Sequence, residues 1–103
     1  MYSIDEIQNK IVPVAKAFNV SKVYIFGSYA RNEATPESDI DFLVDISDSA
    51  IHTFLDLCEF YSQMKALFDI SIDIVTPDAL KPEDRNFIKN IEKDKIIIYD
   101  RKR

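Results

Sequence analysis

The sequence predicts an α/β protein in which helices pack against a β-sheet. Four short runs rich in β-branched and other apolar residues predict strands, at residues 22–26, 40–45, 70–75 and 95–99. Segments that favour helix alternate with them, at residues 3–18, 29–33, 50–67 and 82–91. At 103 residues the chain can bury one hydrophobic core, so we expect a single domain spanning residues 1–103.

The first predicted helix covers residues 3–18. Ser3 and Glu6 have the spacing of a capping box, and an apolar stripe follows them at helical spacing, formed by Ile4, Ile7, Ile11, Ala15 and Phe18. Pro13 lies inside this segment and removes a backbone hydrogen bond, so we expect a kink there or two short helices. Asn19 is the predicted end.

A turn of unusual chemistry follows the strand at residues 22–26. Gly27 and Ser28 lead into residues 29–33, which favour a short helix. Backbone N–H groups at the start of a helix suit a phosphate, and glycine lets the phosphate approach the main chain. Arg31 lies three residues after Ser28, on the same helix face, where its guanidinium can bind a second phosphate group. We therefore predict nucleotide phosphate binding at Gly27, Ser28 and Arg31.

Two aspartates mark the start of the strand at residues 40–45. Because successive side chains of a strand alternate between its faces, Asp39 and Asp41 emerge on one side, roughly 7 Å apart between Cα atoms. Two such carboxylates repel each other unless a cation lies between them. Mg²⁺ prefers few protein carboxylates and completes its shell with water and substrate phosphates. This pair therefore predicts a magnesium site that a nucleotide would share.

The strand at residues 70–75 contains a third aspartate. Its alternation places Ile70, Ile72 and Ile74 on one face and Asp73 on the other. Strands disfavour aspartate, and a carboxylate flanked by isoleucines is costly unless it is paired or binds a metal. An aspartate at position 73 is therefore expected to be paired or to bind a metal, but composition and spacing alone do not show which.

The predicted helix at residues 50–67 is expected to be the longest core helix, with N-cap residues among Ser47, Asp48 and Ser49. Six of its residues share one helical register and are predicted to be buried: Ile51, Phe54, Leu55, Cys58, Tyr61 and Leu67. Cys58, the only cysteine, is therefore predicted to be a core thiol, and no internal disulfide can form. His52 is predicted to occupy an exposed helical position without a metal role.

The composition excludes several classes of protein. A net charge of −5 argues against general nucleic-acid binding, which depends on many basic contacts to phosphate. A single nucleotide can still be held by one arginine, a helix terminus and metal ions. No apolar run reaches membrane-spanning length and the N-terminus does not resemble a signal peptide, so we expect a cytoplasmic protein.

Three of these segments together resemble a known family. Gly27-Ser28, Ala30-Arg31 and Ser38-Asp39-Ile40-Asp41 match the nucleotidyltransferase signature of the DNA polymerase beta superfamily. The short chain is similar to the minimal nucleotidyltransferases, often paired with a helical HEPN-domain partner in toxin–antitoxin modules. The resemblance implies an α/β nucleotidyltransferase core of the polymerase beta type, with helices packed against a mixed β-sheet and with Asp73 completing a catalytic triad of metal ligands. The family usually has glycine after the arginine. Asn32 stands there instead and tolerates the left-handed backbone conformation, so we expect the turn to persist.

The resemblance also implies a reaction. Asp39, Asp41 and Asp73 would bind two Mg²⁺ ions, and AMP would pass from ATP to a hydroxyl group, a tyrosine on a HEPN toxin, so that the chain acts as an antitoxin. One alternative is a non-catalytic antitoxin that neutralises its partner by binding. A second is an antibiotic nucleotidyltransferase similar to kanamycin nucleotidyltransferase, although that enzyme needs further structure to hold its drug. The sequence indicates neither the base preference nor the acceptor.

Overall fold

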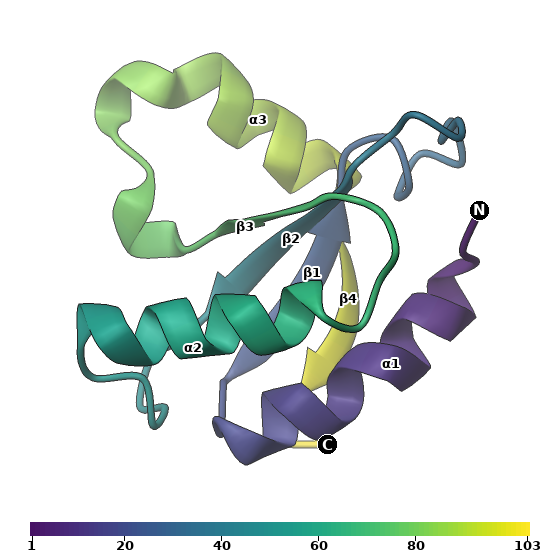
Figure 1. The fold of residues 1–103 in the computed structure, drawn as a ribbon. Coiled ribbons are helices and arrows are strands. Elements are labelled where there is room, and N and C mark those ends of the chain that lie inside the picture. The colour runs from purple at the N-terminus through teal and green to yellow at the C-terminus, as the bar shows by residue number, and fades with distance from the viewer.

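A computed structural model describes residues 1–103 and shows a four-stranded sheet with helices on both faces (Figure 1). The helices and strands are, in order, α1 (Ile4–Ala17), β1 (Lys22–Phe26), β2 (Ile40–Asp45), α2 (Phe54–Lys65), β3 (Ile72–Val75), α3 (Arg85–Asp94) and β4 (Ile96–Asp100). Two short 3₁₀ helices, Pro77–Ala79 and Pro82–Asp84, connect β3 to α3. No helix is both long and apolar enough to cross a membrane.

The sheet is mixed, as predicted, with the strand order β3-β2-β1-β4. β1 runs antiparallel to both β2 and β4, whereas β2 and β3 are parallel and α2 lies in the connection between them. In the register of these pairs, Asp41 faces Phe26 on one side and Asp73 on the other. The second and third predicted aspartates are therefore neighbours in the sheet.

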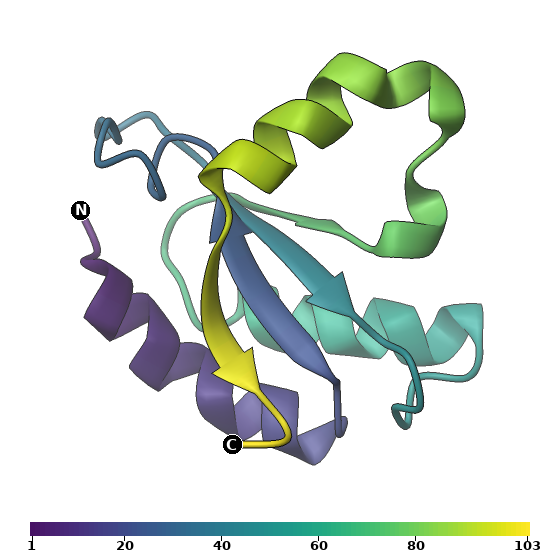
Figure 2. The same ribbon diagram turned by 180° about the vertical axis from the view of Figure 1, so that it is seen from behind.

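Different helices pack on the two faces of the sheet. α1 and α2 lie on the near side in Figure 1 and on the far side in Figure 2, and the larger core cluster joins them to the sheet. α3 packs through Ile91 on a smaller cluster that contains Phe26 and Leu43. Since side chains two apart on a strand share a face, Asp41 lies on the same face as Leu43, the one that α3 partly covers.

α1 is one unbroken helix that contains Pro13, so the predicted alternative of two short helices is wrong. Pro13 lies on the exposed side of the helix, as does Asn9 four residues earlier. The Asn9 carbonyl that loses its intrahelical donor can therefore be hydrated, which lowers the cost of the proline. The predicted ends are confirmed: Ser3 and Glu6 form the capping box, and Asn19 ends the helix in the left-handed conformation, with φ 53°.

α2 differs from its prediction in both start and buried face. It begins at Phe54, because Thr53 and Asp56 form a capping box there. Its buried residues are Phe60 and Met64, and Phe54 is 77% exposed. Leu55 is equally exposed, Cys58 is an exposed thiol rather than a core residue, and His52 is exposed but precedes the helix. With 12 residues against the 14 of α1, α2 is also not the longest helix.

The strands agree more closely with their predictions. β1 and β2 have the predicted bounds, β4 is displaced by one residue, and β3 begins at Ile72 rather than at residue 70. β3 and β4 form the two edges of the sheet, where backbone groups lack a neighbouring strand. Tyr61 Oη donates to the Ile72 carbonyl and Gln8 Nε2 to the Ile98 carbonyl, each at 2.9 Å. One helical side chain thus satisfies one carbonyl on each edge.

Candidate functional site

Residues 27–33 form a single hydrogen-bonded turn, so the short helix predicted at Tyr29–Glu33 is wrong. Glu33 N–H donates to the Ser28 carbonyl at 2.8 Å, and Asn32 N–H donates to the Tyr29 carbonyl at 3.3 Å. Asn32 adopts φ 59°, and a residue in the left-handed conformation ends a helical turn in this way. Asn32 therefore keeps the turn, as expected, but it also prevents a helix whose dipole would favour phosphate.

The turn nevertheless offers free donors. The backbone N–H groups of Ser28, Tyr29 and Ala30 donate to no group of the protein. Successive unpaired N–H groups in a turn make a concave site that suits an anion. The Ser28 hydroxyl lies on the same turn and also forms no hydrogen bond within the protein.

Gly27, the only glycine in the chain, connects this turn to Asp41. Its φ is 76°, which side-chain-bearing residues rarely adopt. A Cβ atom at Gly27 would lie 3.3 Å from Asp41 Cγ and would overlap Asp41 Oδ2. The Asp41 carboxylate thus packs directly against the backbone of the turn, and only glycine leaves room for it.

The three aspartates lie close enough to influence one another. Asp41 is half-buried at the second position of β2, Asp73 is exposed on β3 beside it, and Asp39 is exposed just before β2. Burial first, and then the negative charges of Asp73 and Asp39, together raise the pKa of Asp41 from its ordinary value of 3.8 to about 6. The positive charge of Arg31 opposes this rise. Three side chains predicted from the sequence, Asp39, Asp73 and Arg31, therefore lie near enough to Asp41 to shift its pKa.

These carboxylates do not form a closed metal cluster. No group of three or more His, Cys, Asp or Glu side chains is arranged to hold a metal ion. Mutual repulsion between like charges is a sufficient reason, because the exposed Asp39 and Asp73 can turn toward water. The donor set still suits a divalent cation: carboxylate oxygens are the ligands that Mg²⁺ prefers, and a half-buried anion between two others gains most from one.

Arg31 is engaged by two acidic residues. Its Nε donates to Glu33 Oε1 and its Nη1 donates to Asp94 Oδ2, both at 2.7 Å, whereas Nη2 bonds to no protein group. Asp94 is the last residue of α3. The sequence analysis did not identify Asp94, because the helix was predicted to end at residue 91; in the structure Asp94 lies in the last turn of α3, where the helix dipole disfavours an acidic residue.

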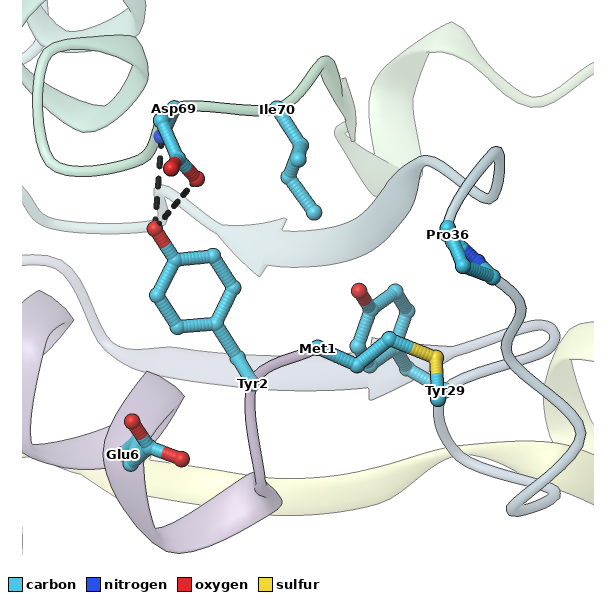
Figure 3. Close-up of a pocket in the computed structure, with 7 residues that line it drawn as sticks. All are labelled: Met1, Tyr2, Glu6, Tyr29, Pro36, Asp69 and Ile70. Atoms are coloured by element: carbon cyan, nitrogen blue, oxygen red, sulfur yellow. Dashed lines mark hydrogen bonds between the residues drawn. The ribbon is translucent and has the colours of Figure 1, made fainter.

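A pocket of about 400 Å³ opens beside this turn but on the α1–α2 side of the sheet. Figure 3 shows its lining residues, which are Met1, Tyr2, Glu6, Tyr29, Pro36, Asp69 and Ile70. Tyr2 Oη donates to Asp69 Oδ1 at 2.6 Å, which joins the N-terminal segment to the loop before β3. With Glu6 and Asp69 in its wall, the pocket is unsuited to phosphate, and it is separate from the carboxylates around Asp41.

Comparison with known proteins identifies relatives of the whole chain. Residues 9–103 match the family model described as polymerase beta, nucleotidyltransferase. A Methanocaldococcus jannaschii protein, provisionally named a protein adenylyltransferase, is 35% identical over 80 residues, which cover 78% of this chain and 84% of that protein. The protein adenylyltransferase MntA of Thermococcus cleftensis is 33% identical over 85 residues, which cover 79% of this chain and 84% of that protein.

A solved structure gives a further comparison. It is the complex of a tri-AMPylated HEPN toxin of Shewanella oneidensis with an MNT antitoxin. The match covers 94% of this chain and 72% of the solved chain, with a TM-score of 0.66 and 17% identity, so it shows a shared fold.

Proposed function

The chain belongs to the polymerase beta nucleotidyltransferase family, and on this basis we propose that it transfers AMP from ATP to a hydroxyl group of a HEPN toxin and acts as its antitoxin. Two observations on relatives support the choice of reaction. The relatives that cover most of this chain are named for protein adenylyl transfer, and a chain of the same fold occurs in a complex with an AMPylated HEPN toxin.

The observation that carries the proposal is the packing of Asp41 against Gly27. It brings a half-buried carboxylate, with Asp73 as its neighbour in the sheet, against a turn with three free N–H groups. Phosphoryl transfer needs such a combination, because anionic oxygens must be held while the metal-binding carboxylates stand next to the reacting phosphorus.

In the proposed site, the turn N–H groups, the Ser28 hydroxyl and Arg31 hold the β- and γ-phosphates of ATP. Asp39, Asp41 and Asp73 are the proposed ligands of two Mg²⁺ ions. Bound Mg²⁺ would offset the charge of the triphosphate and lower the pKa of the acceptor hydroxyl. The raised pKa of Asp41 is consistent with a site whose negative charges are in excess until a cation and ATP bind.

The transfer step is a substitution at the α-phosphorus. The acceptor oxygen forms a bond to this phosphorus, the bond from it to the oxygen that bridges to the β-phosphate breaks, and pyrophosphate leaves with that electron pair. The hydroxyl proton passes to a carboxylate, for which the exposed Asp73 is the proposed acceptor. Arg31 and the turn donors stabilise the charge that develops on the pyrophosphate.

The exposure of the site favours a protein as the acceptor. Asp39 and Asp73 are exposed, and only α3 and Leu80 of the segment before it pack on this face, so the described chain has little with which to enclose a small acceptor. Orientation of the attacking oxygen must then come from the acceptor's own docking surface. A folded partner supplies such a surface, and a tyrosine hydroxyl on a HEPN toxin is the proposed attacking group.

The test is transfer of AMP to the partner. The chain is incubated with ATP, Mg²⁺ and the HEPN protein encoded beside it, and intact-mass spectrometry follows the partner. We expect the partner to gain the mass of AMP, and Asp39→Ala, Asp41→Ala or Asp73→Ala to abolish the gain. The matched control is Glu92→Ala, which removes an acidic residue from α3 away from the carboxylates. A triple aspartate variant that neutralises the toxin fully without added mass would establish the non-catalytic antitoxin instead.

A further inference from the structure

We propose that Asp94, at the C-terminal end of α3, is a positioning residue that holds the Arg31 guanidinium toward the nucleotide's phosphates. The inference rests on the proposed function, because it requires a triphosphate at the turn formed by residues 27–33. It assigns a role in substrate binding to a helix that contributes none of the predicted site residues.

The geometry of α3 directs Asp94 toward the turn. Ile91, one helical turn earlier, is buried in the cluster with Phe26 and Leu43, and residues three apart lie on one helix face. Asp94 therefore points to the same side as Ile91. Phe26 ends β1 immediately before Gly27, so the packing that buries Ile91 also places the end of α3 beside the turn.

The two acidic partners of Arg31 differ in their surroundings. The Asp94 side chain is 10% exposed, whereas the side chains of Glu33 and Arg31 are 63% and 45% exposed. Exposed ion pairs are weak and exchange readily with water, while a largely desolvated carboxylate holds its partner more firmly. Asp94 is therefore the anchor of Arg31, and Glu33 is a contact that a phosphate can replace.

Asp94 does not stabilise α3 through the helix dipole. A carboxylate at the C-terminus of a helix faces the negative end of the helix dipole, and this position favours lysine or arginine. The charge of Arg31 offsets this cost. Residues that break a local rule in this way are expected at functional sites.

Arg31 keeps the donors that a phosphate would need. Asp94 binds Nη1 only, and Nη2 makes no bond within the protein. If the phosphate displaces Glu33, Nε and Nη2 together present two N–H groups on one edge of the guanidinium, a geometry that matches phosphate oxygens. Asp94 can hold the opposite side of the group throughout.

A purely structural role predicts different behaviour from a positioning role. If Asp94 served only to attach α3, its loss would lower stability and affect ATP binding whether or not Arg31 were present. The end of α3 has other attachments, including buried Ile91 and Lys95 Nζ, which lies 4.7 Å from the centre of the Tyr24 ring. The Asp94→Asn protein should therefore fold, and Asp94→Ala provides the second variant.

The experiment is a double-mutant cycle on ATP binding. Calorimetry measures the Kd of ATP in the presence of Mg²⁺ for wild type, Asp94→Asn, Asp94→Ala, Arg31→Ala and the double variant Arg31→Ala with Asp94→Ala. We expect each Asp94 variant to bind ATP about threefold to tenfold more weakly than wild type, the range that coupled neighbours commonly show. In the Arg31→Ala background, Asp94→Ala should change the Kd by less than about twofold, because Asp94 acts through Arg31.

Glu92→Ala is the matched control. It removes one negative charge two residues from Asp94 on the same helix, but Glu92 pairs with Lys95 and not with Arg31. It should leave the Kd within about twofold of the wild-type value, because an exposed pair is weak.

The outcomes separate the two proposals. If wild type binds ATP with Mg²⁺ and the Asp94 variants bind it equally well, the positioning role is wrong and the proposed function stands. If Asp94→Ala weakens binding by the same factor with and without Arg31, Asp94 has a structural role only. Absence of any Mg²⁺-dependent ATP binding by wild type would refute the proposed function, and the inference with it.

Discussion

Asp41 and Asp73 face each other across the parallel pair of β2 and β3, and together with Asp39 they surround a single half-buried carboxyl group with negative charge. This arrangement opposes folding when no cation is present, because Asp41 must keep its charge near two like charges. It is also the arrangement that a divalent cation would stabilise. Stability and the proposed metal-binding role therefore favour different side chains at position 41.

Asp41→Asn should stabilise the metal-free protein. The raised pKa of Asp41 means that its ionised form is disfavoured in the folded state, and asparagine removes that charge with little change in volume. After allowance for solvent screening at a half-exposed group, we expect a gain of about 1 kcal/mol, which raises the Tm by about 4–8 °C. Thermal melts in EDTA measure it. A large loss of stability would mean that Asp41 has a structural role instead.

The same group gives the metal-free protein a characteristic pH dependence. The pKa of Asp41 is about 6 in the folded chain, above its ordinary value of 3.8, so between these values the folded state binds more protons than the unfolded state. The contribution of Asp41 is therefore most favourable below pH 4 and is lost as the pH rises through 6. The free energies of unfolding of wild type and Asp41→Asn should diverge over this window, in favour of the variant at pH 7. Parallel curves would contradict the raised pKa.

Gly27→Ala should damage both the fold and the site. The added Cβ would overlap the Asp41 carboxylate, and alanine is strained at φ 76°, so we expect a loss of about 1–3 kcal/mol in stability. ATP binding in the presence of Mg²⁺ should weaken as well. Asn32→Gly is the control, since it relieves a left-handed residue of the same turn and should change stability by less than about 1 kcal/mol.

A second cycle tests the cause of the Gly27→Ala effect. Combining Gly27→Ala with Asp41→Ala removes the overlapping carboxylate, so the double variant should be more stable than the sum of the single effects predicts. Strict additivity would mean that backbone strain at Gly27 alone explains the loss.

Tyr61→Phe should loosen the strand that carries Asp73. The Tyr61 hydroxyl donates to the Ile72 carbonyl on the outer edge of β3, and removing it leaves that carbonyl without its protein donor. We expect the free energy of unfolding to fall by about 1 kcal/mol. Relative to wild type, hydrogen exchange should accelerate more for the β3 amides than for the β1 amides. Tyr99→Phe is the control, because the Tyr99 hydroxyl forms no hydrogen bond within the protein. Equal exchange in both variants would exclude this role for Tyr61.

The sequence predicted those features that depend on neighbouring residues. The bounds of β1 and β2 follow from short β-branched runs with clear limits, and the start of α1 follows from its capping box. The alternation of strand and helix segments likewise predicted the α/β class, whereas the mixed sheet was expected only from the family resemblance. Asp39 and Asp41 stand two apart near one strand, so their common side followed from the pleat.

The errors have equally specific causes. Three N-cap candidates at residues 47–49 suggested an early start for α2, but the Thr53–Asp56 capping box sets it. Ile51 therefore lies outside the helix and does not mark its buried face, which carries Phe60 and Met64 and leaves Cys58 exposed. Local propensity favoured helix at Tyr29–Glu33, yet the left-handed Asn32 closes it after one turn. The contact between Arg31 and Asp94 joins residues far apart in the sequence, and no local sequence pattern predicts it.

The pairing of Phe26 with Asp41 has a consequence for the order in which the chain folds. The turn at residues 27–33 and the first two aspartates all belong to one antiparallel hairpin, β1 with β2, whose closure spans only the loop between them. Asp73 joins them only after α2 has formed a longer crossover, and closing a longer loop costs more entropy and takes longer. The protein should therefore assemble the proposed phosphate-binding turn, with Asp39 and Asp41, before Asp73 joins them. Folding kinetics of two variants test this order through the ratio of the change in folding activation free energy to the change in stability. We expect a ratio near one for Val44→Ala in β2 and near zero for Ile72→Val in β3.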